Sequence, residues 1–160
     1  MPQPSYGLPV AAASMAPHGG WLWLGCHGGA GVSSLAHAVP GGLDAERLWP
    51  APGAFRHPVV LVCRSHAAGL TAAQTAARQW ASGAVPGADL LGLVVVADAP
   101  GALPRPLKDL LQLIRGGFPR TWLAPWVDAW RLGEPPAAHL PRQLQPLRRE
   151  LAHLTGRQHG

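Results

Sequence analysis

A short apolar run followed at once by glycines and a helix start is the feature that most constrains this fold. The run Trp21-Leu22-Trp23-Leu24 is typical of a short buried strand, and Ser33 is a suitable helix start. The residues between them are rich in glycine. A strand, a glycine turn and a helix N-terminus form the usual context of a phosphate-binding loop, because the N–H groups of the turn face the anion.

Further along the chain, apolar strands alternate with helices. Residues 58–63 and 90–97 are continuous apolar runs, which predict strands covered on both faces. Apolar spacing predicts helices over 33–38, 70–81 and 106–114, and residues 120–124 predict a fourth, short strand. We therefore expect an α/β domain with a mostly parallel sheet of about four strands, ordered as they occur in the chain, with flanking helices. Right-handed crossovers predict that the second and third helices share one face.

The segments outside these elements divide the chain into three parts. We expect a disordered N-terminal tail over 1–20, the α/β domain over 21–134, and a C-terminal amphipathic helix and tail over 135–160. Within the domain, 39–58 is predicted to be irregular, with helical turns over 43–49 that place Trp49 in the core. The C-terminal leucine stripe, which Pro146 kinks or delays, is expected to pack on its own domain or on a second copy. We expect the opposite face of the sheet to be covered by that stripe, by residues 39–58 or by a second copy of the chain.

The composition limits the classes of partner that we expect. Charged residues make up 13% of the 160, against about 25% in an average protein, and Lys108 is the only lysine. The net charge of +5 leaves weak nucleic-acid contact open, but no interleaved aromatic and basic motif predicts a dedicated DNA-reading surface. Two cysteines favour a reduced, cytoplasmic protein, and no apolar run is long enough to predict a membrane span.

The glycine loop resembles the deviant Walker A motif of the ParA/MinD family, Lys-Gly-Gly-x-Gly-Lys-Ser/Thr-Ser/Thr. On that pattern His27 replaces the first lysine, Val32 replaces the second, and Ser33 stands where the family has its Mg²⁺-binding hydroxyl. The resemblance implies a reduced P-loop NTPase-like fold with ATP or another nucleotide, and Mg²⁺, as the expected ligands. Without the lysines the charge that assists phosphoryl transfer is missing, so we predict no catalytic residues and no ATP turnover.

The resemblance extends over residues 21–134. Residues 59–65, 91–98 and 123–126 are similar to later ParA/MinD strands, and the whole segment resembles an uncharacterised family of small actinobacterial P-loop-like proteins associated with mobile elements. Only 24 residues lie between Ser34 and Val59, too few for the two strands and the Walker B aspartate of the full family. Asp44 and Glu46 are the carboxylates there, and neither is predicted to end a strand.

The candidate site follows from the loop and from nearby cationic side chains. Its predicted phosphate- or nucleotide-binding residues are His27, Gly28, Gly29, Ala30, Gly31, Val32, Ser33, Ser34, Arg64 and His66. Three functions remain open from the sequence. The first is a degenerate domain that binds a nucleotide or phosphate without hydrolysis and acts through a protein partner or homodimer in a mobile element. The others are a weak NTPase completed in trans by a partner or second subunit, and a structural adaptor with a relic loop.

Two further clusters have the residue types of a functional site, but ordinary structural roles also explain them. Cys26-His27 and Cys63-x-x-His66 have the residue types of a zinc site, but buried structural cysteines are the commoner outcome, and no metal site is predicted. Trp122, Trp126 and Trp130 recur every four residues and suggest a base-stacking platform, although Pro125 interrupts any helix through them. We expect these tryptophans to belong to the core, and Asp98 to cap the loop that follows its strand.

Overall fold

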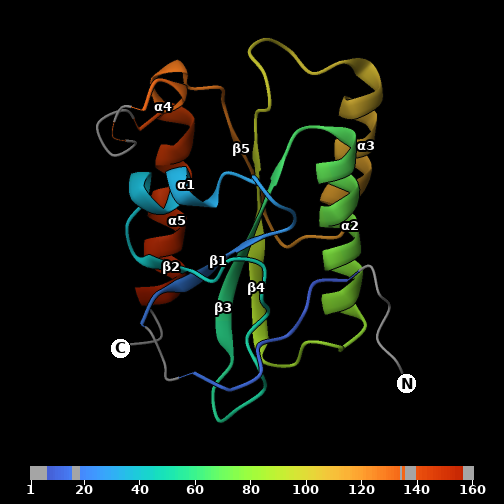
Figure 1. Cartoon of the computed structure of the whole chain (residues 1–160), viewed down its shortest axis with the longest axis vertical. Helices are drawn as coiled ribbons and strands as arrows, with labels where there is room; N and C mark the ends of the chain where they lie inside the picture. The colour runs from blue at the N-terminus through green and yellow to red at the C-terminus, as the bar shows by residue number, and fades with distance from the viewer. Residues whose placement is uncertain (1–6, 16–18, 134, 136–139, 157–160) are drawn as a thin grey trace.

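The computed structural model describes residues 7–15, 19–133, 135 and 140–156, and its centre is a parallel sheet (Figure 1). The strands are β1 (Trp21–Gly25), β2 (Gly42–Asp44), β3 (His57–Arg64), β4 (Ala88–Val96) and β5 (Thr121–Ala124). Their order across the sheet is β2-β1-β3-β4-β5, and all neighbours are parallel. The predicted α/β class with a mostly parallel sheet is confirmed, with one strand more than expected.

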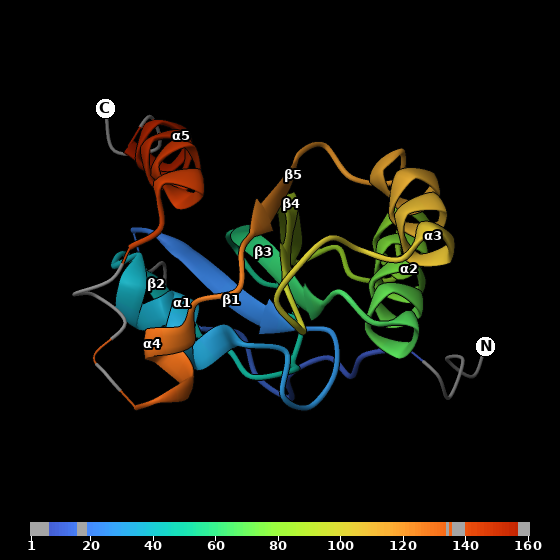
Figure 2. The ribbon, with the colours of Figure 1, turned by 90° about the horizontal axis from the view of Figure 1, so that it is seen from above.

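Helices cover both faces of this sheet. They are α1 (Val32–Ala38), α2 (Ala67–Ala81), α3 (Arg105–Arg115), α4 (Asp128–Arg131) and α5 (Gln145–Gly156), with a 3₁₀ turn, η2 (Arg142–Leu144), before α5. Figure 2 shows α2 and α3 together on one side of the sheet, and α1, α4 and α5 on the other. The shared face of α2 and α3 confirms the prediction from right-handed crossovers. Among the described helices, none has the length and apolar character needed to cross a membrane.

The two core clusters lie on opposite faces of the sheet. Leu22 and Leu24 of β1 pack in the cluster beneath α2 and α3, whereas Trp21 and Trp23 pack in the cluster beneath α1 and α5. This division follows from the alternation of side chains along a strand. It explains why β1 and the central residues of β3 and β4 are apolar: each strand buries both of its faces.

The extra strand, β2, lies within the segment that the sequence predicts to be irregular. It pairs with β1 through Gly42, Leu43 and Asp44, so the expected helical turns over 43–49 do not begin at Leu43. Gly42 permits this pairing, because a Cβ atom there would lie 2.4 Å from Nε1 of Trp21 and 2.6 Å from Nε1 of Trp23. The backbone of β2 therefore packs directly against the two indole rings.

The C-terminal leucine stripe covers the second face. Leu144, Leu147 and Leu151 are fully buried in the cluster that also holds Trp23. Pro146 is the second residue of α5, a position where its missing N–H costs nothing, so it marks the helix start and does not kink the helix. The stripe thus packs on its own domain, one of the two predicted outcomes.

Trp49 and residues 7–15 both lie against α2. Trp49 is fully buried as predicted, and its Nε1–H donates to Oε1 of Gln79 at 2.9 Å. Residues 7–15 also contact this region: Val10 forms a parallel bridge with Trp49, and the N–H of Leu8 donates to Gln79 Oε1 at 3.0 Å. The expected disordered tail is therefore wrong for residues 7–15, while residues 1–6 and 16–18 lie outside the described residues.

Candidate functional site

The chain changes direction across the sheet between β1 and β3. From β1 it passes through α1 to the edge strand β2, then returns to β3 on the other side of β1. α1 and α2 consequently lie on opposite faces (Figure 2). In open parallel sheets this reversal leaves a crevice outside the carboxyl ends of the two strands, where ligands commonly bind. The glycine loop follows β1 and Arg64 ends β3, so both lie at this crevice.

Residues 26–31 form a tight loop between β1 and α1. The N–H of Cys26 donates to the carbonyl oxygen of Val62 at 2.9 Å, which anchors the start of the loop to β3. Gly29 and Gly31 have φ values of 73° and 100°, in the left-handed region that favours glycine. Because Gly31 directly precedes α1, its carbonyl accepts the N–H of Leu35 at 3.2 Å. The glycines therefore serve the loop's conformation.

His27 ties this loop to β3. Its Nδ1–H donates to the carbonyl oxygen of Gly28 at 2.9 Å, and its Nε2 accepts the backbone N–H of Arg64 at 3.0 Å. This pair of bonds requires an imidazole with one proton, on Nδ1, and leaves Nε2 as an acceptor. A Cβ atom on Gly69 would lie 2.9 Å from that Nε2, so the first turn of α2 closes tightly over the ring. The structure thus gives His27 a loop-forming role in place of the predicted replacement cation.

His66 has a similar structural role at the start of α2. Its Nδ1 accepts the N–H of Gly69 at 2.8 Å, which caps the helix. The rings of His66 and His27 lie 5.1 Å apart between centroids. His66 belongs to the predicted site, but it is not among the residues that line the pocket described below.

Of the predicted cationic residues, Arg64 is the one whose charged group the structure places at the loop. Its Nε–H donates to the carbonyl oxygen of Gly29 at 3.1 Å, and its Nη1–H donates to that of Ala97 at 3.2 Å. A Cβ atom on Gly31 would lie 3.5 Å from the guanidinium carbon. The guanidinium therefore lies between the loop and the end of β4. Its hydrogen bonds to Gly29 and Ala97 hold it in this position.

The opposite wall comes from β2 and the turn after it, which the sequence did not predict. Asp44 is the last residue of β2, so the expectation that it ends no strand is wrong. Its Oδ1 accepts the N–H of Glu46 at 2.8 Å, and the carbonyl of Glu46 accepts the N–H of Gly25 at 2.7 Å. Glu46 has a φ of 58°, unusual for a residue with a side chain. This turn brings Nη1 of Arg47 to 3.8 Å from the Cβ position of Gly28.

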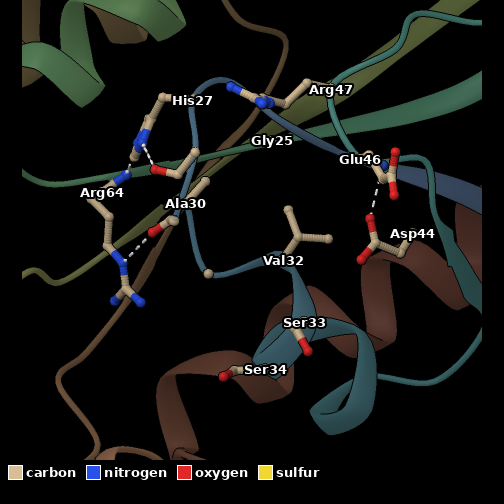
Figure 3. Close-up of a pocket in the computed structure, with 13 residues that line it drawn as sticks. Gly25, His27, Ala30, Val32, Ser33, Ser34, Asp44, Glu46, Arg47 and Arg64 are labelled. Carbon is tan, nitrogen blue, oxygen red and sulfur yellow. Dashed lines mark hydrogen bonds between the residues drawn. The ribbon is translucent and has the colours of Figure 1, made fainter.

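These walls enclose an open pocket of about 400 Å³ (Figure 3). Arg64 and His27 lie on one side of it, Asp44, Glu46 and Arg47 on the other, and Val32 stands between them. Nine of the ten predicted site residues line the pocket; Gly25, Asp44, Glu46 and Arg47 line it as well. Within the described residues, no hydrogen-bond acceptor is present for the backbone N–H groups of residues 28–34. The loop therefore presents unpaired donors between two arginines.

The two cysteines are buried thiols: Cys26 begins the loop and Cys63 lies in β3. Burial raises the pKa of Cys63 from 9.0 to about 12, and burial and the neighbouring Cys63 raise the pKa of Cys26 well above its usual range. Protonated thiols are poor metal ligands and poor nucleophiles. The described residues also contain no group of three or more histidine, cysteine or carboxylate side chains placed to hold a metal ion.

Comparisons with other proteins identify a family. The model of a family of unknown function, DUF6668, matches residues 20–145, which include every element from β1 to η2. Searches of the curated proteins and of the solved structures found no match to the chain. The match covers more than half of the chain and includes the loop, Arg47, Arg64 and the strands β1, β2 and β3.

Proposed function

The chain belongs to DUF6668, a family of unknown function, and we propose from its site that it binds the phosphate of a nucleotide or related small molecule without hydrolysing it. The observation that carries the proposal is the row of unpaired N–H groups over residues 28–34, flanked by Arg47 and Arg64. Backbone N–H groups in a turn form an anion-binding concavity, and the positive charge of nearby guanidinium groups attracts phosphate.

The position of the pocket supports the same proposal. It lies at the carboxyl ends of β1 and β3, where the strand order reverses. Its volume of about 400 Å³ falls within the range of small-molecule sites. Asp44 and Glu46 bring two carboxylates to the far wall, so the net charge of the lining is not strongly positive. We therefore expect the phosphate to lie over the loop, between Arg47 and Arg64, and to bind with modest affinity.

The site lacks the cation that usually assists hydrolysis. Val32 stands where the resembled family has a lysine, and its side chain is buried among apolar residues of the second core cluster. Lys108, the only lysine, is on α3, on the other side of the sheet. A cation at the transferring phosphoryl group contributes about 10³-fold or more to the rate. We therefore propose binding without turnover by the isolated chain.

One observation favours a second candidate, a weak NTPase. Asp44 and Glu46 share the pocket with the hydroxyl of Ser33, and Mg²⁺ is typically held by one or two carboxylates together with substrate phosphates. Carboxylate and hydroxyl oxygens are the ligand types that such an ion takes, and the ion would neutralise phosphate charge. The missing cation would then come from a second subunit or a partner. A structural adaptor with a relic loop is the remaining alternative, and it requires that the loop bind no anion.

The wider role that we propose rests on resemblance alone. Residues 21–134 resemble small actinobacterial proteins associated with mobile elements. A domain that binds a nucleotide without hydrolysing it can act by binding a different partner in its bound form. We propose that the bound form acts through a protein partner or a second copy, in the cytoplasm, in the maintenance or transfer of a mobile element.

Titration calorimetry with pyrophosphate and ADP, each with and without Mg²⁺, tests the proposal. Arg47→Gln removes a guanidinium from the pocket at an exposed position, and we expect it to weaken pyrophosphate binding about threefold to tenfold. Arg78→Gln is the matched control, because Arg78 is an exposed arginine on α2 that does not line the pocket. Absence of binding by both ligands, or equal losses in the two variants, would contradict the proposal.

A parallel assay separates the two binding candidates. We expect phosphate release from ATP to equal that of a control without protein. Release above the control that Gly31→Pro abolishes would instead establish the NTPase, because Gly31 has a φ of 100° that proline cannot adopt.

A further inference from the structure

Residues 8–11, here called the strap, are bound to Trp49 through their backbone. The N–H of Trp49 donates to the carbonyl oxygen of Pro9 at 2.9 Å, and the N–H of Ala11 donates to the carbonyl oxygen of Trp49 at 2.8 Å. These bonds flank Val10, which forms the parallel bridge with Trp49. A peptide that adds a strand to a domain is recognised in the same way, through its main chain.

Gln79 of α2 binds the strap with its side-chain amide. Its Oε1 accepts the N–H of Leu8 at 3.0 Å, and its Nε2–H donates to the carbonyl oxygen of Leu8 at 2.7 Å. The same Oε1 accepts the Nε1–H of Trp49 at 2.9 Å. One amide therefore satisfies both backbone groups of Leu8 and also the indole of Trp49. These bonds recognise the main chain of the strap and not the identity of its side chains.

The strap also lies outside the segment that matches the family. The match covers residues 20–145, which include Trp49 and Gln79 but not residues 8–11. Two side chains of the strap, Leu8 and Val10, are partly buried against the first core cluster of the domain. The matched domain thus carries a binding surface whose occupant, in this chain, comes from outside the match.

Trp49 connects the strap to the wall of the loop pocket. The turn that carries Arg47 is held on one side by the bond from the N–H of Gly25 to the carbonyl oxygen of Glu46. On its other side, two residues after Arg47, it is held by the bonds of Trp49 to the strap. Glu46 has a φ of 58°. Such a backbone costs about 1–3 kcal/mol and persists only where its surroundings hold it, so this turn needs an anchor on each side.

We propose that the strap is a detachable peptide ligand of the domain, and that its binding positions Arg47 at the loop pocket. When the strap is bound, the turn keeps Arg47 beside Gly28; when the strap is released, the turn relaxes and the pocket loses one of its two arginines. Gln79 is then a positioning residue, because it acts on the pocket through the strap and Trp49. The effect on the pocket rests on the proposed anion site, whereas the binding of the strap does not.

A full-length variant with both Leu8→Pro and Ala11→Pro tests the two parts of this inference. The prolines remove the N–H groups that the strap donates to Gln79 and Trp49, and they leave the matched segment unchanged. We expect the indole N–H resonance of Trp49 to shift in this variant and to return when a synthetic peptide of residues 7–15 is added. Pyrophosphate binding should weaken about threefold, near the lower end of the range expected for Arg47→Gln, and the same peptide should restore it.

The controls separate positioning from general destabilisation. Ala13→Pro is the matched single change, because Ala13 is exposed and its N–H donates to no group in the part of the chain that the structure describes. It should leave the Trp49 resonance and pyrophosphate binding unchanged. A peptide that carries the two prolines should restore neither. In an Arg47→Gln background the two prolines should weaken pyrophosphate binding no further, because the strap acts through Arg47.

Three results would overturn the inference in distinguishable ways. If the peptide of residues 7–15 does not restore the Trp49 resonance, the strap is not a detachable ligand. If the peptide restores the resonance but the variant binds pyrophosphate as tightly as the unmodified chain, the strap binds without positioning Arg47. If the unmodified chain binds no pyrophosphate, the proposed function fails and the positioning of Arg47 fails with it, while the Trp49 resonance still decides whether the strap is a ligand.

Discussion

Replacing His27 with alanine should destabilise the loop and the domain. The change removes the bond from Nδ1 to Gly28 and leaves the N–H of Arg64 without its acceptor. Each lost hydrogen bond costs about 0.5–1.5 kcal/mol, and an unpaired N–H that is partly buried adds to this. We therefore expect the free energy of unfolding to fall by about 2–4 kcal/mol, a large fraction of the roughly 5–15 kcal/mol of a typical domain.

Urea denaturation followed by tryptophan fluorescence measures this loss. With a slope of about 1–3 kcal/mol per molar urea, the midpoint should fall by about 1–2 M. His37→Ala is the matched control, because His37 is exposed on α1 and makes one side-chain bond, to the carbonyl of Ser33 at 2.8 Å. Its effect should stay within about 0.5 kcal/mol. If His27→Ala is as stable as His37→Ala, and hydrogen exchange at the Arg64 amide is unchanged, the loop-forming role of His27 is refuted.

Three other outcomes follow from the packing and charges. Leu147→Ala should lower the free energy of unfolding by about 2–5 kcal/mol in the same urea assay, because Leu147 is fully buried under the second face; a change below about 1 kcal/mol would show that α5 covers little. Asp44→Asn should strengthen pyrophosphate binding in Mg²⁺-free calorimetry by removing a carboxylate from the pocket; weaker binding would contradict the anion site as drawn. The free energy of unfolding should fall between pH 9 and about 12, by up to about 1.4 kcal/mol per pH unit for the Cys63 thiol. In this range the unfolded chain releases the thiol proton, whereas the folded chain keeps it. Cys63→Ala should therefore reduce the dependence of stability on pH, measured by urea titrations at several pH values.

The parts of the fold that the sequence predicts are those that bury both faces of a strand. Val59 to Cys63 and Leu93 to Val96 are apolar without interruption, so their strands follow from the sequence pattern, and their parallel pairing follows from the helices predicted between the strands. β2 has no such pattern: its three residues are partly or fully exposed, and its position depends on the contact of Gly42 with two indole rings. That contact is a tertiary feature, which local periodicity does not encode.

The same limit applies to the candidate site. The glycine loop is recognisable because its spacing determines its turn, and Arg64 follows a strand that is itself predictable. Arg47 was missed because its approach to Gly28 needs both β2 and the positive φ of Glu46. One signal was available, since Asp44-x-Glu46 permits a side-chain-to-backbone turn of the kind that Asp44 makes with the N–H of Glu46.

An amide titration with pyrophosphate tests the central claim most directly. If the loop holds phosphate through its backbone, the largest shifts in a ¹⁵N–¹H spectrum should fall on residues 28–34, where the N–H groups lack protein acceptors. Arg47→Gln should require more pyrophosphate for the same shifts. Shifts confined to the exposed arginines of α5, Arg148 and Arg149, or no shifts at all, would contradict the claim that this loop is an anion site.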